Sequence, residues 1–241
     1  MNRYFSRIAM RHSRPIAIAA LYVAVISGGT ACSLGGYNPF IIPAFFVSQI
    51  DNPYFPLVPG TTFFYEADTP DGFETSQAFV THHTKTILGV TCIVVRDKVF
   101  LDGSLIEDTF DFYAQDRHGN VWYFGEDSTT YDNGVPTGTE GSWEAGVDGA
   151  KPGITMEAHP KVGDSYRQEY LAGVAEDTAD VLNLNKSVTV PYGAFTNCLK
   201  TKDYSPLEPD VVEYKYYAQG VGNVLVREGG ARVELVNVTV E

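Results

Sequence analysis

Two segments of the chain carry the same alternation of aromatic and charged residues. Residues 108–121 read DTFDFYAQDRHGNV, and residues 212–224 read VEYKYYAQGVGNV. Alternation with a period of two is typical of a β-strand, whose successive side chains point to opposite faces of a sheet. A glycine then supplies the positive φ angle of a tight turn. Each segment therefore predicts a strand, a turn and the start of a second strand.

The alternation also predicts which side chains face the core. In the first segment Phe110 and Phe112 flank Asp111. In the second, Tyr216 follows Lys215. Because the apolar face of a half-buried strand packs on the core, we expect the aromatic set to point inward and the charged set outward.

The resemblance between the segments predicts an internal duplication. Residues 113–115 and 217–219 both read YAQ, and Cys92 and Cys198 lie 21 and 19 residues before these tyrosines. We predict a first β repeat at 60–135, an inter-repeat loop at 136–159 and a second β repeat at 160–241. The alternative is chance similarity among tyrosine-rich strands.

The composition indicates an all-β fold. Tyrosine and phenylalanine number 15 and 14 against three methionines. No stretch offers three turns of amphipathic helix, whereas valine and threonine recur in alternating runs. We expect antiparallel sheets from two tandem repeats, which form a sandwich, a half-barrel or a barrel.

The first 31 residues have the organisation of a secretory signal peptide. Four arginines and no acidic residue precede an apolar run at 16–26, which small residues follow. The run is shorter than the roughly 20 residues that a membrane-spanning helix needs. We therefore predict export and removal of residues 1–31.

The end of this signal resembles a bacterial lipobox. Thr30 and Ala31 precede Cys32, although Gly29 stands where the usual pattern has an aliphatic residue. The resemblance implies a lipid anchor on Cys32. Ser33 in the next position implies an outer-membrane lipoprotein. The alternative is ordinary cleavage after Ala31, which would release a secreted or periplasmic protein.

The exported chain is strongly acidic. Without residues 1–31 it keeps 13 lysines and arginines against 30 aspartates and glutamates, a net charge of −17. Such a surface repels nucleic acid, which we exclude as a partner, and it favours cationic ligands.

The segment at 32–59 is rich in proline and aromatic residues. Its prolines prevent regular structure, and it is too apolar for a plain tether. We predict a tether or cover segment that lies along the domain or plugs the mouth of a cavity.

The glycine-rich inter-repeat loop holds the candidate site residues. Its length is typical of a functional loop, and an ordered crossover is the alternative. We predict a ligand site at Trp143 and Lys151, and a calcium site at Glu144 and Asp148, because calcium prefers carboxylate oxygens. No other cofactor is expected.

Cys92 and Cys198 are the thiols that remain if Cys32 carries a lipid. They are a candidate disulfide in an oxidising compartment, or two separate buried cysteines. The sequence leaves both alternatives open.

Three segments, DTFDFYAQDRHGNVWYFGED, GSWEAGVDGAKPG and 190–224, resemble an uncharacterised family of bacterial secreted lipoproteins. The resemblance covers residues 50–241 and implies no activity. We assign no catalytic residue. We expect a non-enzymatic envelope lipoprotein that binds an apolar or cationic ligand or a partner protein. The alternative is a secreted hydrolase that uses calcium or carboxylates such as Glu107 and Asp111.

Overall fold

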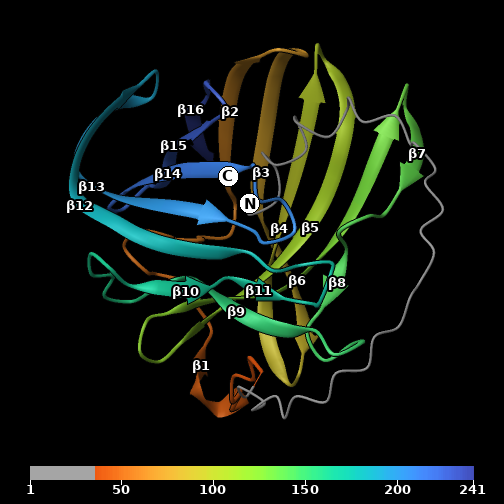
Figure 1. Cartoon of the computed structure of the whole chain (residues 1–241), viewed down its shortest axis with the longest axis vertical. Coiled ribbons are helices and arrows are strands. Elements are labelled where there is room, and N and C mark those ends of the chain that lie inside the picture. Colours follow the sequence, from red (N-terminus) through yellow and green to blue (C-terminus); the bar gives the residue numbers. More distant parts are fainter. Residues whose placement is uncertain (1–35) are drawn as a thin grey trace, which may run out of the picture.

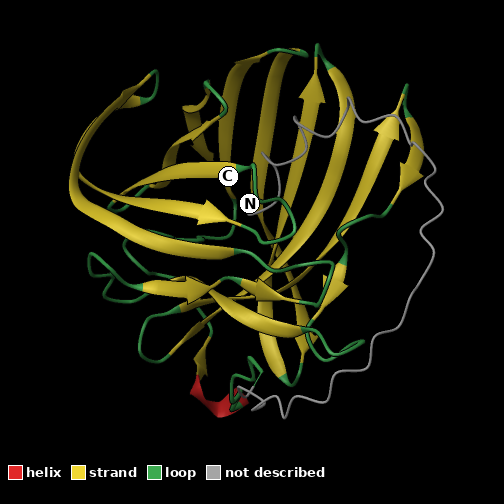
Figure 2. Cartoon of the chain, viewed as in Figure 1, coloured by secondary structure: helices red, strands yellow, loops and turns green. Residues whose placement is uncertain are grey.

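The computed structural model describes residues 36–241, so the predicted signal peptide and Cys32 lie outside it. This part of the chain is antiparallel β-structure with one 3₁₀ turn, η2 (Figure 2). The predicted all-β class is confirmed. None of its helices is long and apolar enough to cross a membrane. The elements are η2 (Pro43–Phe45), β1 (Phe46–Val47), β2 (Thr61–Thr69), β3 (Gly72–Ile87), β4 (Val90–Leu101), β5 (Ser104–Asp116), β6 (Val121–Asp132), β7 (Val135–Gly138), β8 (Trp143–Glu144), β9 (Lys151–Met156), β10 (Ser165–Arg167), β11 (Glu169–Tyr170), β12 (Thr178–Val190), β13 (Gly193–Tyr204), β14 (Val212–Ala218), β15 (Gly222–Glu228) and β16 (Ala231–Val240).

The strands form one sheet whose two ends meet, giving a nearly closed barrel (Figure 1). The strand order is β10-β12-β13-β14-β15-β16-β2-β3-β4-β5-β6-β9-β11. Only Gln168 separates β10 from β11 in the chain, and these strands pair with β12 and β9 respectively. One short segment therefore bonds to both ends of the sheet and holds them together.

The closure requires a glycine in β9. A Cβ atom on Gly153 would lie 2.3 Å from the carbonyl carbon of Gln168. Any side chain at Gly153 would push β9 away from the closing segment, because glycine in a strand permits such a close backbone approach.

The segment at 36–59 lies against one end of the barrel, where Figure 1 shows η2 and β1. Ile50, Phe55 and Leu57 are buried. The side-chain oxygen of Gln115, near the end of β5, accepts hydrogen bonds from the backbone N–H groups of residues 51 and 52, at 3.0 and 2.9 Å. These contacts bind the segment to the β5–β6 hairpin.

A chain of aromatic rings joins this segment to the barrel wall. The ring centroids of Phe55 and Tyr113 are 5.4 Å apart, those of Tyr113 and Tyr123 are 4.8 Å apart, and those of Tyr123 and Trp143 are 5.4 Å apart. Such pairs stabilise a core beyond the area that they bury.

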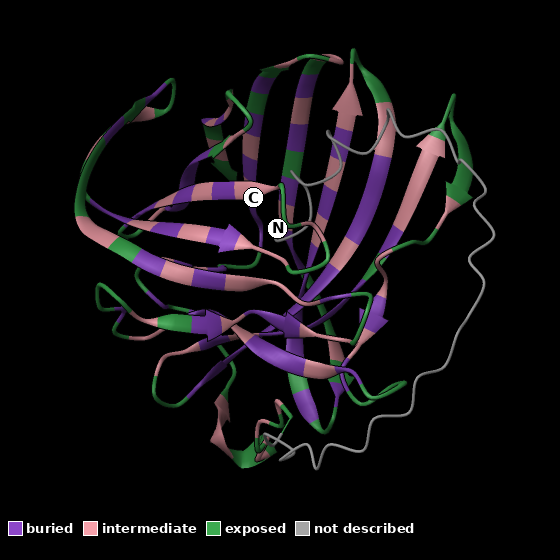
Figure 3. Ribbon diagram, in the orientation of Figure 1, coloured by how far each residue is buried: buried purple, intermediate pink, exposed green. Residues whose placement is uncertain are grey.

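Buried and exposed residues alternate along many of the strands (Figure 3).

The two predicted repeats pair in an equivalent way with the strand before each YAQ segment, but differently with the strand after it. Tyr113 lies opposite Ile93 between β5 and β4, and Tyr217 lies opposite Leu199 between β14 and β13. In the following hairpins, Tyr113 pairs with Tyr123, whereas Tyr217 pairs with Asn223. The duplication stays a prediction.

The predicted inter-repeat loop contains regular structure. Within 136–159 lie most of β7 and all of β8 and β9, and each of these strands pairs with β6. The segment is therefore part of the barrel wall, because its backbone groups continue the hydrogen bonding of the sheet beyond β6.

Candidate functional site

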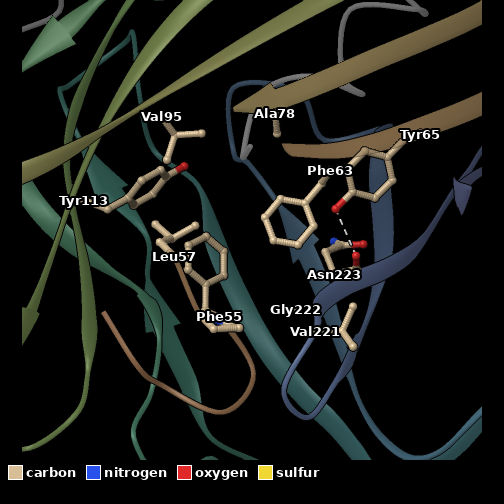
Figure 4. A pocket seen from close by; sticks show the side chains of 11 residues that line it. Phe55, Leu57, Phe63, Tyr65, Ala78, Val95, Tyr113, Val221, Gly222 and Asn223 are labelled. Atoms are coloured by element: carbon tan, nitrogen blue, oxygen red, sulfur yellow. Dashed lines mark hydrogen bonds between the residues drawn. The ribbon is translucent and has the colours of Figure 1, made fainter. Parts of the chain in front are cut away.

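The charged residues of the two alternating segments face the barrel interior. Tyr113 lines an interior cavity with Phe63 and Tyr65 of β2 (Figure 4). Asp111 lies on the same face of β5 and is 1 % exposed. In the second segment Lys215 is also 1 % exposed. The prediction that the charged set points outward is wrong.

The aromatic set lies on the outer face, under long cationic side chains. The Arg96 guanidinium lies 5.1 Å from the ring centroid of Phe110, and the Lys85 ammonium 4.1 Å from that of Phe112. Lys200 covers the tyrosines of β14 in the same way. Cationic side chains shield aromatic surface with their stems while their charges stay hydrated. The charged residues of both segments therefore lie on the inner face.

Carboxyl groups from six strands line this interior. Glu126 lies directly opposite Asp111, and Glu228 directly opposite Glu213, in neighbouring strands. Residues that lie opposite each other in an antiparallel pair share a face of the sheet. We define the acidic belt as the set of Glu74, Asp97, Glu107, Asp111, Glu126, Glu213 and Glu228.

Asp97 is the belt carboxyl with the least favourable environment. Burial raises its pKa to about 8, and the negative charges of Asp111 and Glu107 add to the shift. The side chain is 2 % exposed, and its Oδ1 atom has no hydrogen-bond partner among the described residues. A buried acceptor without a donor is unfavourable, so this atom is available to a ligand.

Repulsion between carboxyls also raises the pKa values of Glu74 and Glu228. Burial, followed by the charge of Glu107, raises the pKa of Glu74 to about 7. Burial and then Glu213 raise the pKa of Glu228 to about 8, with a further contribution from Glu74. The charge of Glu74 on β3 thus reaches Glu228 on β15, across β2 and β16, which contribute no belt carboxyl.

Two belt carboxyls share one hydroxyl. The Tyr123 oxygen lies 2.6 Å from Asp111 Oδ1 and 2.9 Å from Glu126 Oε2. Tyrosine has a single hydroxyl hydrogen and can donate to only one acceptor at a time. The two carboxyl oxygens therefore compete for this one hydroxyl hydrogen.

Lys215 is the only buried basic side chain in residues 36–241. Its ammonium lies 3.0 Å from Glu213 Oε2 and 3.2 Å from Asp203 Oδ2. Burial lowers the pKa of Lys215, but these two carboxylates outweigh burial and hold it well above its ordinary value. Glu213 Oε1 remains without a partner in the described part of the chain, and the residue is 5 % exposed.

An apolar floor lies next to the belt. Phe55, Leu57, Phe63 and other apolar side chains enclose a cavity of about 20 Å³ (Figure 4), which is room for about one water molecule. Ala78, in the cavity wall, lies directly opposite Asp97. The interior therefore combines a filled apolar end with an acidic wall.

The structure does not bring the four predicted loop residues together. The Trp143 indole donates a hydrogen bond to Glu169 Oε2 at 3.1 Å, inside the barrel. Glu144 forms a salt bridge with Lys85 at 2.6 Å. Lys151 donates to Asn38 in the cover segment. Asp148 is exposed in a turn, with a φ of 50°.

The predicted calcium site has no preformed cluster of ligands around it. No group of three or more histidine, cysteine, aspartate or glutamate side chains is arranged to hold a metal ion within 36–241. Calcium needs six to eight oxygen ligands, which Glu144 and Asp148 cannot supply alone. Calcium binding there stays a prediction.

Cys92 and Cys198 are free, buried thiols. They lie in β4 and β13, which are not neighbours in the sheet. A disulfide between them stays a prediction.

Most of the belt cannot be recognised in the sequence. Glu107 and Asp111 are one of many acidic pairs in an acidic chain. The available signal was the composition of the alternating strands, in which charged residues occupy every second position. Periodicity identifies two faces and does not say which one is enclosed.

Comparisons with known proteins do not identify the chain. No family model and no curated protein matches it. One solved structure, described as a "putative lipoprotein" from Parabacteroides distasonis, is similar with a TM-score of 0.42 and 13 % sequence identity, over 79 % of this chain and 100 % of that one. A likeness of this size supports no conclusion about function.

Proposed function

We propose that this chain is an exported envelope lipoprotein, a non-enzymatic binding module whose barrel interior takes a cationic ligand. The observation that carries the proposal is Asp97, a buried carboxyl with a free acceptor oxygen in a wall of other carboxyls.

The electrostatics of the barrel interior favour a cationic ligand. A buried carboxylate loses several kcal/mol of hydration unless a positive charge or hydrogen-bond donors replace the water. Lys215 supplies such a charge next to Glu213. Among the residues with described side chains, no lysine or arginine forms a salt bridge with Asp97. A cation that enters the barrel would both neutralise Asp97 and donate to it.

The proposal is tested by cation binding to the purified mature protein. Calorimetric titration with Mg²⁺, butylamine and spermine at equal ionic strength should show binding of at least one of them. Binding should release protons near pH 7.5, because the pKa values of Glu74 and Asp97 lie near 7 and 8. Asp97→Asn should weaken that binding by about tenfold or more.

The matched control for this titration is Asp68→Asn, which removes the same charge from an exposed position on β2. Diffuse attraction to an acidic surface would be reduced equally by both substitutions. Equal losses, or no binding of any of the three cations, would reject the proposal.

The lipid anchor is a separate part of the proposal and rests on the sequence around Cys32. Cys32→Ala should move the protein from the membrane fraction to the soluble one, and globomycin should block its maturation. Mass spectrometry of the mature N-terminus measures the acylation directly. An unmodified N-terminus would leave export standing and remove the anchor.

One observation favours the alternative of a secreted hydrolase: the carboxyls of Asp111 and Glu126 lie opposite each other in neighbouring strands. Paired carboxyls can act as acid and base on a glycosidic bond. Both are bound to Tyr123, however, and are 1 % and 6 % exposed. A substrate would have to displace that tyrosine before reaching them, so we favour binding over hydrolysis.

A further inference from the structure

The acidic belt holds two buried acceptors on different sides of the barrel. Asp97 Oδ1 is on β4 and Glu213 Oε1 is on β14, and neither has a partner among the described residues. β15, β16, β2 and β3 lie between these strands in the sheet. With neighbouring strands about 4.8 Å apart, the two strands are separated by roughly 24 Å along the wall.

The charged side chains that surround the two acceptors are different. The charges that act on Asp97 include those of Asp111 and Glu107. Those that act on Glu213 include Lys215 and Asp203. One small ion binds its ligands at about 2.0–2.6 Å and so serves only neighbouring oxygens. A single compact cation would therefore leave one of the two acceptors unsatisfied.

Carboxyls line both ends of the wall between the two acceptors, while β2 and β16 in its middle contribute none. Glu228 lies directly opposite Glu213, and the charge of Glu74 contributes to the raised pKa of Glu228. The charge of Glu107 in turn contributes to the raised pKa values of both Glu74 and Asp97. A chain of positive groups laid along this wall would face carboxyls at both of its ends.

Lys215 shows the kind of group that suits these carboxyls. Its primary ammonium is held at 3.0 and 3.2 Å between two buried carboxylates. An ammonium on a flexible stem has three donors and can serve several carboxylate oxygens at once. The protein thus already satisfies one end of the belt with an alkylammonium group.

We propose that the ligand of the barrel is a linear polyamine, a flexible chain with at least two ammonium groups that bridges Asp97 and the Glu213–Glu228 pair. This inference rests on the proposed function and specifies its ligand. The alkyl segments between the amines would pass the apolar side chains next to the belt, including Ala78 and Val95.

The test compares spermine with butylamine, which has one ammonium group, at equal ionic strength on the mature protein. Calorimetric titration should show spermine binding at least about a hundredfold more tightly, because two charge-assisted contacts form instead of one. Asp97→Asn and Glu213→Gln should each weaken spermine binding by about tenfold. Glu66→Gln, on the exposed face of β2, is the matched control and should have little effect.

Glu213→Gln also changes the environment of Lys215, so Glu228→Gln serves as a second variant at that end, and thermal unfolding monitors the fold of each protein. Spermine binding that depends on Asp97 alone would overturn the bridging inference. Butylamine or Mg²⁺ binding as tightly as spermine, with loss in Asp97→Asn, would also overturn it while leaving the proposed cation site intact. Absence of binding by all three cations would reject both.

Discussion

Asp97→Asn should make the ligand-free protein more stable at pH 8, by about 3–5 kcal/mol in the free energy of unfolding. The pKa of this carboxyl is about 8 in the folded protein, first because of burial, and about 3.9 in an unfolded chain. Asparagine has the same shape without the charge. Its amide could donate to the carboxyls that now repel Asp97.

The sign of the pH dependence follows from the raised pKa. Between about pH 4 and pH 8 the folded protein keeps a proton on Asp97 that the unfolded chain has lost, so stability falls as pH rises through this window. Glu74 and Glu228, with pKa values of about 7 and 8, act in the same direction. Once the pH exceeds the folded-state pKa values of these three carboxyls, the free energy of unfolding stops falling.

Urea unfolding at pH 5 and pH 8 measures this effect. The wild-type protein should be less stable at pH 8 than at pH 5, and the difference should shrink in Asp97→Asn. Asp68→Asn is exposed and should change stability by less than about 0.5 kcal/mol. Equal pH dependence in the wild type and Asp97→Asn would show that Asp97 is hydrated and that the interior is open to water at that point.

Lys215→Met should have the opposite effect and destabilise the protein at pH 8 by about 3–5 kcal/mol. The ammonium is 1 % exposed and neutralises Glu213 and Asp203. Methionine fills much of the volume but leaves two buried carboxylates without a positive charge. Removal of one partner from a buried ion pair is costly for this reason.

Thermal and urea unfolding of two further variants identify the cause of that loss. Adding Glu213→Gln to Lys215→Met should restore part of the lost stability, because it removes one of the unneutralised charges. Lys200→Met removes a lysine from the outer face, where it covers tyrosine rings, and should cost about 1 kcal/mol or less. A small effect of Lys215→Met, or no recovery in the double variant, would mean that water reaches these carboxylates.

The predicted site and the observed belt differ for an identifiable reason. The predicted site rests on closeness in sequence alone, within a glycine-rich segment that contains Trp143, Glu144, Asp148 and Lys151. In a strand, however, neighbouring residues point to opposite faces, and Trp143 and Glu144 form β8. The belt instead joins residues far apart in sequence, which only the pairing of strands can bring together.

The sequence by itself determined the β-strands, the positions of turns and the absence of long helices within residues 36–241, because a two-residue period and turn-forming glycines are local properties. It also determined the acidic charge. Only the tertiary structure decided which face of each strand is enclosed. Phe110 and Phe112 lie outside under Arg96 and Lys85, while Asp111 lies inside. Both placements obey the same alternation, and the closure of the sheet through residues 165–170 chooses between them.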